Sequence, residues 1–190
     1  MNEKIDRKFS SQEPLTITRT FMAPRDQIFD GFINDEKLKQ WWSPKDFTCS
    51  YFKNDPRVGG TYLGCMRSSD GKKIWSKGYY IEIRAAEKLK YSDSFADENG
   101  KVVPATVYHM SSEFPLECIV EIVFSDVVDG TKITLKHSGI PEVDLKNCTL
   151  GWEECLNKLG ALVENSGRSN RSEAEIRSTS TSVNQNIDYV

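Results

Sequence analysis

The chain of 190 residues has only two histidines, His109 and His137. Two histidines cannot form a three-histidine zinc site, and no His-Glu-x-x-His motif or Cys/His cluster is present to complete one. The sequence also lacks the Gly-x-Ser-x-Gly motif of serine hydrolases and the Gly-x-x-x-x-Gly-Lys-Ser/Thr motif of P-loop enzymes. We therefore predict no metal, no cofactor and no catalytic residue from these patterns. They favour a non-enzymatic protein and leave enzymatic activity open.

The chain also lacks an excess of positive charge. It has 25 Lys and Arg against 28 Asp and Glu, a net charge of −3. Nucleic-acid-binding modules and polybasic membrane contacts both need clustered Lys and Arg, so neither partner is expected. No apolar run reaches the ~18 residues of a membrane span. The first residues lack the apolar core of a secretory signal, so we expect a soluble protein.

The five cysteines, Cys49, Cys65, Cys118, Cys148 and Cys155, form an odd set without a Cys-x-x-Cys pair. A disulfide framework is not expected from such a set, and a reduced, cytoplasmic setting is the natural interpretation. Cys148 and Cys155 fall on one predicted helix, about 10 Å apart along its axis. That separation is too long for a disulfide.

Aromatic residues mark the folded part of the chain, since 18 of the 20 lie between Leu15 and Asn165. We predict one domain over residues 15–165, enough to bury roughly two thirds of its unfolded surface. Residues 1–14 are expected to be a flexible N-terminal lead-in. Residues 166–190 are rich in Ser, Thr and Asn without a helical or alternating apolar pattern, and are expected to be a disordered polar tail.

The patterning within the domain predicts mostly strands. Alternation over residues 15–22 indicates a half-buried strand. Two short helices follow, one starting at Pro24 and one capped by Asn34, and Pro44 ends the second. Further strands, joined by short turns and therefore antiparallel, are expected from residue 47 and over 62–66, 74–83, 89–95, 116–124 and 132–137. Apolar residues spaced by three and four then predict one long helix from residue 145 to 163.

Four local motifs resemble one known family. They are Ile17-Thr-Arg-Thr-Phe-x-Ala-Pro24, Leu38-Lys-Gln-Trp-Trp-Ser-Pro44, Asp55-Pro-Arg-Val-Gly-Gly60, and Gly151-Trp152 with Leu156 and Leu159. Over residues 15–165 the chain resembles the activator of Hsp90 ATPase homologues (AHSA1-like) of the START/Bet v 1-like (SRPBCC) superfamily. The resemblance implies an α+β helix-grip fold. In it, a curved antiparallel sheet of about six to seven strands wraps a long C-terminal helix, with two short helices between strands one and two.

The glycines in these motifs have a structural interpretation. Gly59-Gly60 is expected to turn the backbone sharply, and it is no phosphate cradle because a strand follows it. Gly151 is expected to let the long helix approach a strand closely, although glycine costs ~1 kcal/mol in a helix.

Strand alternation places three ionisable residues, Arg19, Asp93 and His137, on the face that carries apolar neighbours. Buried charges must be paired or neutralised, so at least two of the three are expected to meet or to reach a pocket mouth. The first and last strands of this fold are neighbours, which makes Arg19 and His137 candidate companions. The alternative is that all three lie near strand ends in solvent.

A second candidate set consists of large apolar side chains. They could line a ligand cavity between sheet and helix, or simply pack the core: Trp41, Trp42, Phe47, Tyr62, Met66, Trp75, Tyr79, Tyr108, Met110 and Trp152. The segment 102–115 is longer than a tight hairpin needs and is expected to form a flap or entrance. His109 falls there, where a surface histidine is expected.

The resemblance implies two classes of function. The first is binding of an apolar small molecule, a lipid or an aromatic compound, in the cavity. The alternative is a chaperone-associated interaction module, or an enzyme similar to the polyketide cyclases of the superfamily. A stress or transport function through a lipid or aromatic ligand is a third possibility beside the two classes. The eukaryotic co-chaperone of the family carries a second, N-terminal domain, which the 14 residues before this domain are not expected to supply. A monomer and a homodimer are both compatible with the sequence.

Overall fold

The computed structural model describes residues 13–183, and side chains as far as Glu164. Most of the expected lead-in, residues 1–12, and the end of the expected tail, residues 184–190, lie outside the described residues. The elements follow in the order β1 (Leu15–Phe21), α1 (Arg25–Ile33), α2 (Asp35–Trp41), β2 (Phe47–Asn54), β3 (Thr61–Ser68), β4 (Lys73–Arg84), β5 (Lys88–Ala96), the 3-10 helix η1 (Ala105–Tyr108), β6 (Cys118–Val127), β7 (Gly130–Ser138) and α3 (Glu142–Val183).

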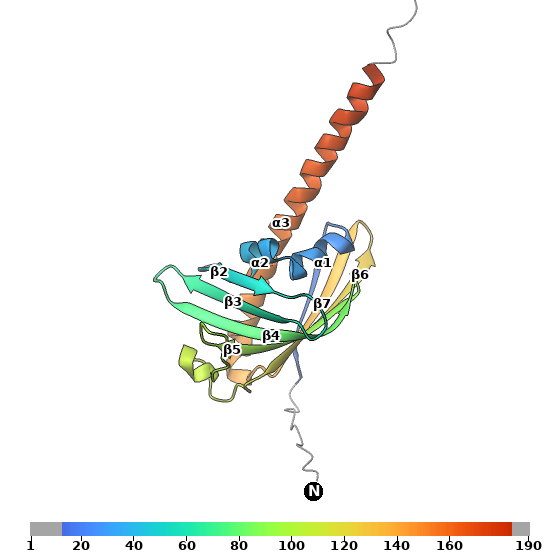
Figure 1. The fold of residues 1–190 in the computed structure, drawn as a ribbon. Helices are drawn as coiled ribbons and strands as arrows, with labels where there is room; N and C mark the ends of the chain where they lie inside the picture. The colour runs from blue at the N-terminus through green and yellow to red at the C-terminus, as the bar shows by residue number, and fades with distance from the viewer. Residues whose placement is uncertain (1–12, 184–190) are drawn as a thin grey trace, which may run out of the picture.

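The strands of the described chain form one antiparallel sheet of seven, in the order β1-β7-β6-β5-β4-β3-β2. The sheet is strongly curved, and α3 passes across its concave side while α1 and α2 cover one end (Figure 1). Each consecutive pair from β2 to β7 is antiparallel, and β1 closes the order by pairing with β7. This arrangement confirms the helix-grip fold expected from the sequence.

Local signals in the sequence explain where the elements begin and end. Pro24 stands immediately before α1, and the Asn34 side chain accepts hydrogen bonds from the backbone N–H groups of Glu36 and Lys37 at the start of α2. These bonds satisfy amides that have no partner within the helix. Gly71 adopts a φ of 88° in the turn between β3 and β4, a conformation that favours glycine.

The core forms where α3 and the short helices meet the concave face of the sheet. Leu156 and Leu159 of α3 are fully buried, as is Leu135 of β7. A Cβ placed on Gly31 of α1 would lie 2.8 Å from the Leu159 side chain, so a larger residue there would force Leu159 to shift. Trp41 is also fully buried, and its indole Nε1 donates a hydrogen bond to the Gly31 carbonyl oxygen at 2.8 Å.

Helix α3 runs to Val183 and so does not end near residue 165, where the apolar pattern stops. The part of the expected disordered tail before residue 184 is therefore helical. Residues 166–183 contain no proline, the residue that most strongly interrupts a helix. The domain boundaries drawn from the sequence stay a prediction.

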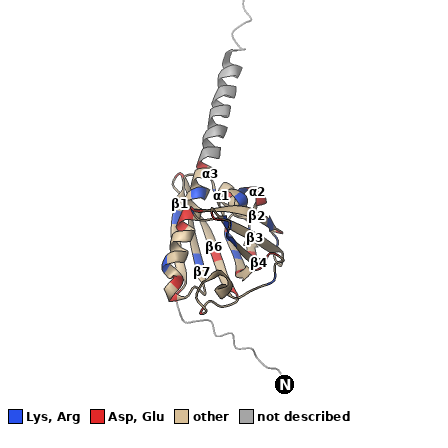
Figure 2. Cartoon of the chain, turned by 90° about the vertical axis from the view of Figure 1, so that its left-hand side faces the viewer, with Lys and Arg blue, Asp and Glu red and all other residues tan. Residues whose placement is uncertain are grey.

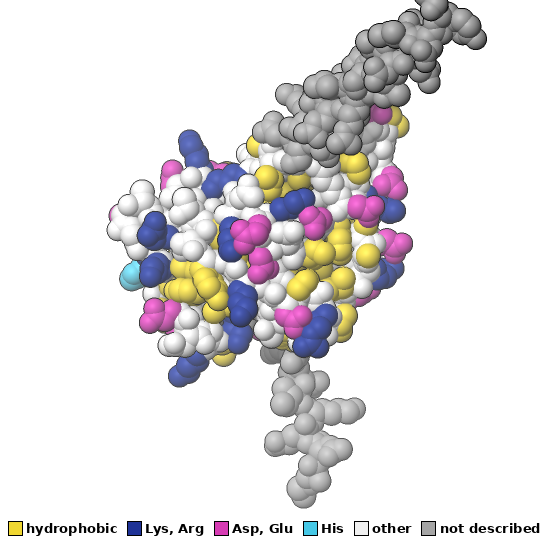
Figure 3. Space-filling view, turned by 45° about the horizontal axis from the view of Figure 1, so that its top comes forward, with side chains coloured by type: hydrophobic (Ala, Val, Ile, Leu, Met, Phe, Trp, Pro, Cys, Tyr) yellow, Lys and Arg dark blue, Asp and Glu magenta, His cyan; other side chains and the backbone are white. Residues whose placement is uncertain are grey.

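The surface carries charges of both signs. Positions of Lys and Arg and positions of Asp and Glu are both spread over the strands and the described part of α3 (Figure 2). On the face shown in Figure 3, hydrophobic side chains form small groups separated by charged ones. In residues 13–183 no helix combines the length and apolar character that crossing a membrane requires.

Candidate functional site

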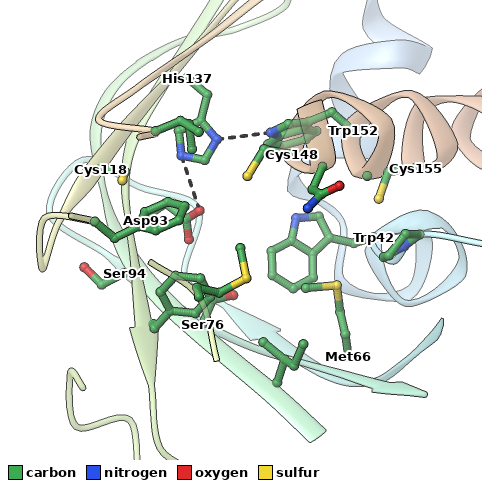
Figure 4. Close-up of a pocket in the computed structure, with 18 of the residues that line it drawn as sticks. Trp42, Met66, Ser76, Asp93, Ser94, Cys118, His137, Cys148, Trp152 and Cys155 are labelled. Atoms are coloured by element: carbon green, nitrogen blue, oxygen red, sulfur yellow. Dashed lines mark hydrogen bonds and ion pairs between the residues drawn. The ribbon is translucent and has the colours of Figure 1, made fainter. Parts of the chain in front are cut away.

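A pocket of about 270 Å³ lies between the concave face of the sheet and the first turns of α3. Strands β3 to β7, the segment after α2, the loop after β5 and α3 all contribute to its wall (Figure 4). The lining residues are Trp42, Pro44, Met66, Ile74, Ser76, Asp93, Ser94, Phe95, Met110, Phe114, Pro115, Cys118, His137, Ile140, Asn147, Cys148, Gly151, Trp152 and Cys155.

His137 is the buried imidazole of this wall. It continues the inward-facing row of β7 after Ile133 and Leu135, and it is only 7% exposed. The indole Nε1 of Trp152 donates a hydrogen bond to His137 Nδ1 at 3.1 Å. Because an indole N–H can only donate, Nδ1 must be unprotonated and the ring carries its proton on Nε2.

Burial lowers the pKa of His137, and the nearby Asp93 carboxylate opposes that effect only in part. The imidazole is therefore neutral at pH 7. Its Nε2 lies 3.7 Å from Asp93 Oδ2, which is too long for a hydrogen bond. Within the described residues this Nε2 is buried without any hydrogen-bond partner.

Asp93 is held in place by Tyr62. The Tyr62 hydroxyl donates to Asp93 Oδ1 at 2.6 Å. Burial, followed by the charge of Asp93, raises the pKa of Tyr62 well above its usual value, so the hydroxyl stays protonated and can donate. A Cβ on Gly78 would lie 2.5 Å from the Tyr62 ring, so a glycine in β4 provides the space in which this tyrosine reaches the carboxylate.

The remaining wall is neutral. Burial raises the pKa of the Cys118 thiol to about 12, that of Cys148 to about 11 and that of Cys155 to about 12. These thiols therefore stay protonated and are poor nucleophiles. All five cysteines are free. In the described chain, no group of three or more His, Cys, Asp or Glu could hold a metal ion.

The loop after β5 closes one side of the pocket with Met110, Phe114 and Pro115. It is fastened by Tyr108, whose hydroxyl donates to the Ala96 carbonyl oxygen at 2.5 Å and accepts from the Trp75 backbone N–H at 3.3 Å. His109 follows in a left-handed conformation with a φ of 62° and is exposed, as the sequence predicted. The segment thus forms a wall of the pocket.

Six of the residues proposed from the sequence line the pocket: Trp42, Met66, Asp93, Met110, His137 and Trp152. The expected meeting of buried ionisable groups is confirmed for His137 and Asp93. Whether any of these residues binds a ligand stays a prediction. The other candidates lie elsewhere in the structure: Arg19, Trp41, Phe47, Tyr62, Trp75, Tyr79 and Tyr108.

The expected contact between Arg19 and His137 is wrong. β1 and β7 are neighbours, but the register places Arg19 opposite Ile133 and Leu15 opposite His137. Arg19 instead pairs with Glu153 of α3 at 3.2 Å and hydrogen-bonds Asn157. Both partners lie toward the solvent side of the helix.

Trp75 and Tyr79 point away from the pocket because β4 alternates. Their neighbours Ser76 and Gly78 occupy the inner face, where Ser76 is only 7% exposed. Trp41 packs into the core while its neighbour Trp42 reaches the pocket. Ser76 was not predicted from the sequence, because a small polar residue in a strand carries no signal of a pocket.

The expectation for Gly151 is also wrong. A Cβ at this position would meet no heavy atom within 4 Å, so the glycine does not bring the helix against a strand. Gly151 faces the pocket instead, on the same side of α3 as Cys148, Trp152 and Cys155. Their spacing of three and four residues was the signal in the sequence that could have identified this wall.

Comparison with known proteins places the chain in a family. The family model described as "Activator of Hsp90 ATPase homolog 1-like protein" matches residues 22–164. A solved structure from Chromobacterium violaceum is 28% identical, with 80% of this chain and 97% of that chain covered and a TM-score of 0.68. Comparison with curated proteins gives no match.

Two further structures agree in fold. A protein from Nitrosomonas europaea is 20% identical, covers 84% of this chain and 99% of its own, and has a TM-score of 0.67. The AHSA1 protein from Silicibacter pomeroyi is 18% identical, covers 80% of this chain and 99% of its own, and has a TM-score of 0.66.

Proposed function

The chain belongs to the activator of Hsp90 ATPase homolog 1-like family, and we propose that it binds a small, largely apolar molecule in the pocket between the sheet and α3. One observation carries the proposal. The pocket wall is made mainly of aromatic, aliphatic and sulfur-containing side chains, yet His137 Nε2 and Ser76 Oγ are buried there without hydrogen-bond partners among the described residues. Ligand sites typically combine such an apolar wall with a few placed polar groups.

The size of the pocket limits the ligand. A volume of about 270 Å³ equals about nine water molecules at ~30 Å³ each. It lies just below the usual range of sites for drug-sized ligands, ~300–1,000 Å³. An aromatic compound with one short side chain fits this volume better than a long-chain lipid does.

The chaperone-associated role named as the alternative rests on the family alone. The pocket is observed in the structure of this chain, and we therefore place the ligand first. Buried neutral thiols and a neutral imidazole give the pocket little nucleophilic or acidic power at pH 7, which favours binding over catalysis.

The test uses Gly151, which lines the pocket and where an added Cβ would meet no heavy atom within 4 Å. The neutral probe 2-(1-naphthyl)ethanol is titrated into the protein and binding is measured by calorimetry. Gly151→Leu should fill the pocket and abolish binding, with an unchanged circular-dichroism spectrum. Gly151→Ala is the matched control and should still bind.

Two results would contradict the proposal: no binding to the wild type, or equal binding to the Gly151→Leu variant. Native mass spectrometry of the freshly purified protein adds a direct observation. A co-purified small molecule should be present on the wild type and missing from Gly151→Leu.

A further inference from the structure

The described residues that line the pocket carry charge of one sign only, and that charge is negative. Among the residues that line the pocket in the described chain, Asp93 is the only carboxylate, and no lysine or arginine accompanies it. Its side chain is 24% exposed. A carboxylate in apolar surroundings is costly unless it is paired, so this position calls for a positive or hydrogen-donating partner.

The neighbours of Asp93 do not neutralise it. Tyr62 gives Oδ1 one hydrogen bond and no charge. His137 faces Oδ2 at 3.7 Å, but its Nδ1 accepts from Trp152 and burial lowers its pKa, so the ring is neutral. Among the described residues, Asp93 thus lines the pocket without a charged partner.

A second acceptor lies beside Asp93. Ser76 is 93% buried, being 7% exposed, and its hydroxyl has no hydrogen-bond partner among the described residues. Ser76 is paired with Phe95 across β4 and β5, which makes it the diagonal neighbour of Asp93 on the same face. An ammonium group carries three N–H donors and no acceptor, so it could use both oxygens.

The surroundings strengthen the negative field. Asp144, in the first turn of α3, is only 8% exposed. Burial is the main cause of the raised pKa of Cys148 in the pocket wall, and the charges of Asp144 and Asp93 raise it further. Lys158 lowers the pKa of Cys155, against the larger effect of burial, but it does not line the pocket. Its Nζ donates hydrogen bonds to Ser43 Oγ, Pro44 O and Phe47 O at 2.9–3.0 Å.

The aromatic wall suits a cation that carries a ring. Trp42 lies across the cavity from Asp93 and His137, and Met66 lies beside Trp42 (Figure 4). Aromatic rings pack favourably against one another, and thioethers make favourable contacts with aromatic rings, so the ring of such a ligand suits this side of the pocket.

Building on the proposed function, we infer that the ligand is a protonated amine on an aromatic body. Its ammonium group lies against Asp93 and Ser76, and its ring lies on the Trp42 side of the pocket. The pocket therefore selects by charge as well as by shape, and it disfavours carboxylates of the same size.

The experiment compares three probes with the same ring and similar side chains: 2-(1-naphthyl)ethylamine, 2-(1-naphthyl)ethanol and 1-naphthylacetic acid. Each is titrated into the full chain at pH 7 by calorimetry, where the amine is protonated and the acid ionised. We expect the amine to bind about tenfold more tightly than the alcohol, because a charge-assisted hydrogen bond replaces a neutral one. The acid should bind about tenfold more weakly than the alcohol.

Variants assign the preference to its source. Asp93→Asn keeps an oxygen for Tyr62 and removes the charge, so amine binding should fall about tenfold while alcohol binding changes little. Glu98→Gln removes one charge from the exposed turn after β5 and should leave all three affinities unchanged. Ser76→Ala should weaken the amine severalfold, and it serves as the second variant if Asp93→Asn fails to fold.

The outcomes separate the two proposals. If the alcohol binds as tightly as the amine in the wild type, the inference about charge is overturned and the ligand pocket stands. An amine preference that persists in Asp93→Asn and in Ser76→Ala also overturns it. If none of the probes binds, the proposed function fails and the inference fails with it.

Discussion

His137 should make the protein lose stability as the pH falls. Burial lowers the pKa of its imidazole, while the Asp93 carboxylate 3.7 Å away acts in the opposite direction and is the weaker influence. In the unfolded chain the pKa returns to ~6.5. Above that value the ring is neutral in both states and has no effect on stability.

Below pH ~6.5 the His137 imidazole is protonated in the unfolded chain but stays neutral in the folded protein. The free energy of unfolding therefore decreases with decreasing pH. The decrease continues until the pH reaches the lowered pKa of the folded state and then levels off. One such group changes the free energy of unfolding by up to ~1.4 kcal/mol per pH unit. Between pH 7.5 and 5.5 the loss is therefore at most about 1.4 kcal/mol, or roughly 0.7 M in the urea midpoint for an m-value near 2 kcal/mol/M.

The assay is urea unfolding, followed by tryptophan fluorescence, of the wild type and His137→Asn across this range. Asn can still accept the hydrogen bond from Trp152, but it does not titrate. The difference between the two proteins should shrink as the pH falls, since only the wild type loses this contribution. His109→Asn is the matched control, because it replaces an exposed histidine at a φ of 62°, which Asn tolerates.

Parallel profiles for the wild type and His137→Asn would refute the reasoning. If the wild type instead gained stability relative to the variant as the pH falls, the predicted sign of the pH dependence would be wrong. The His137 ring would then be protonated in the folded state and form an ion pair with Asp93.

Three further predictions concern stability and are checked by the same urea assay at pH 7. Gly151→Ala should stabilise the protein by up to ~1 kcal/mol, because alanine is the better helix former and its Cβ meets no atom; a destabilised variant would place Gly151 against a neighbour. Tyr62→Phe should cost about 1–3 kcal/mol, because the partly buried carboxylate of Asp93 loses its hydrogen bond; a change below ~0.5 kcal/mol would show that water replaces the hydroxyl. Leu159→Ala should cost about 2–5 kcal/mol, whereas Leu150→Ala, at a position 53% exposed on the same helix, should cost far less; equal costs would contradict the packing described for α3.

Strand alternation predicted the polar side of the pocket from sequence. His137 follows Ile133 and Leu135 in the inward row of β7, and Asp93 follows Leu89 and Tyr91 in β5. A period of two is enough to say which face a residue occupies. The same rule placed Arg19 inward, but its partners were beyond prediction, because they depend on how α3 crosses the sheet.

The aromatic side of the pocket was harder to predict. Trp41 and Trp42 are adjacent, and the helix pattern did not decide which enters the core and which reaches the pocket. In β4 the small residues Ser76 and Gly78, not the large Trp75, mark the inner face. A pocket exists where the inward row is small, so a search for large apolar residues misses part of its wall.

The position of the Tyr108 hydroxyl has a consequence for hydrogen exchange. Trp75 and Ala96 are cross-strand partners, yet the oxygen that receives the Trp75 amide belongs to Tyr108, and the same hydroxyl donates to Ala96. The Trp75 amide proton is therefore protected from deuterium only while the loop stays fastened. The exchange rate of this amide therefore reports how often the loop after β5 opens locally while the rest of the sheet stays folded. A bound ligand that contacts Met110 or Phe114 should slow that exchange, so occupancy of the pocket can be followed at a backbone site that the ligand does not touch.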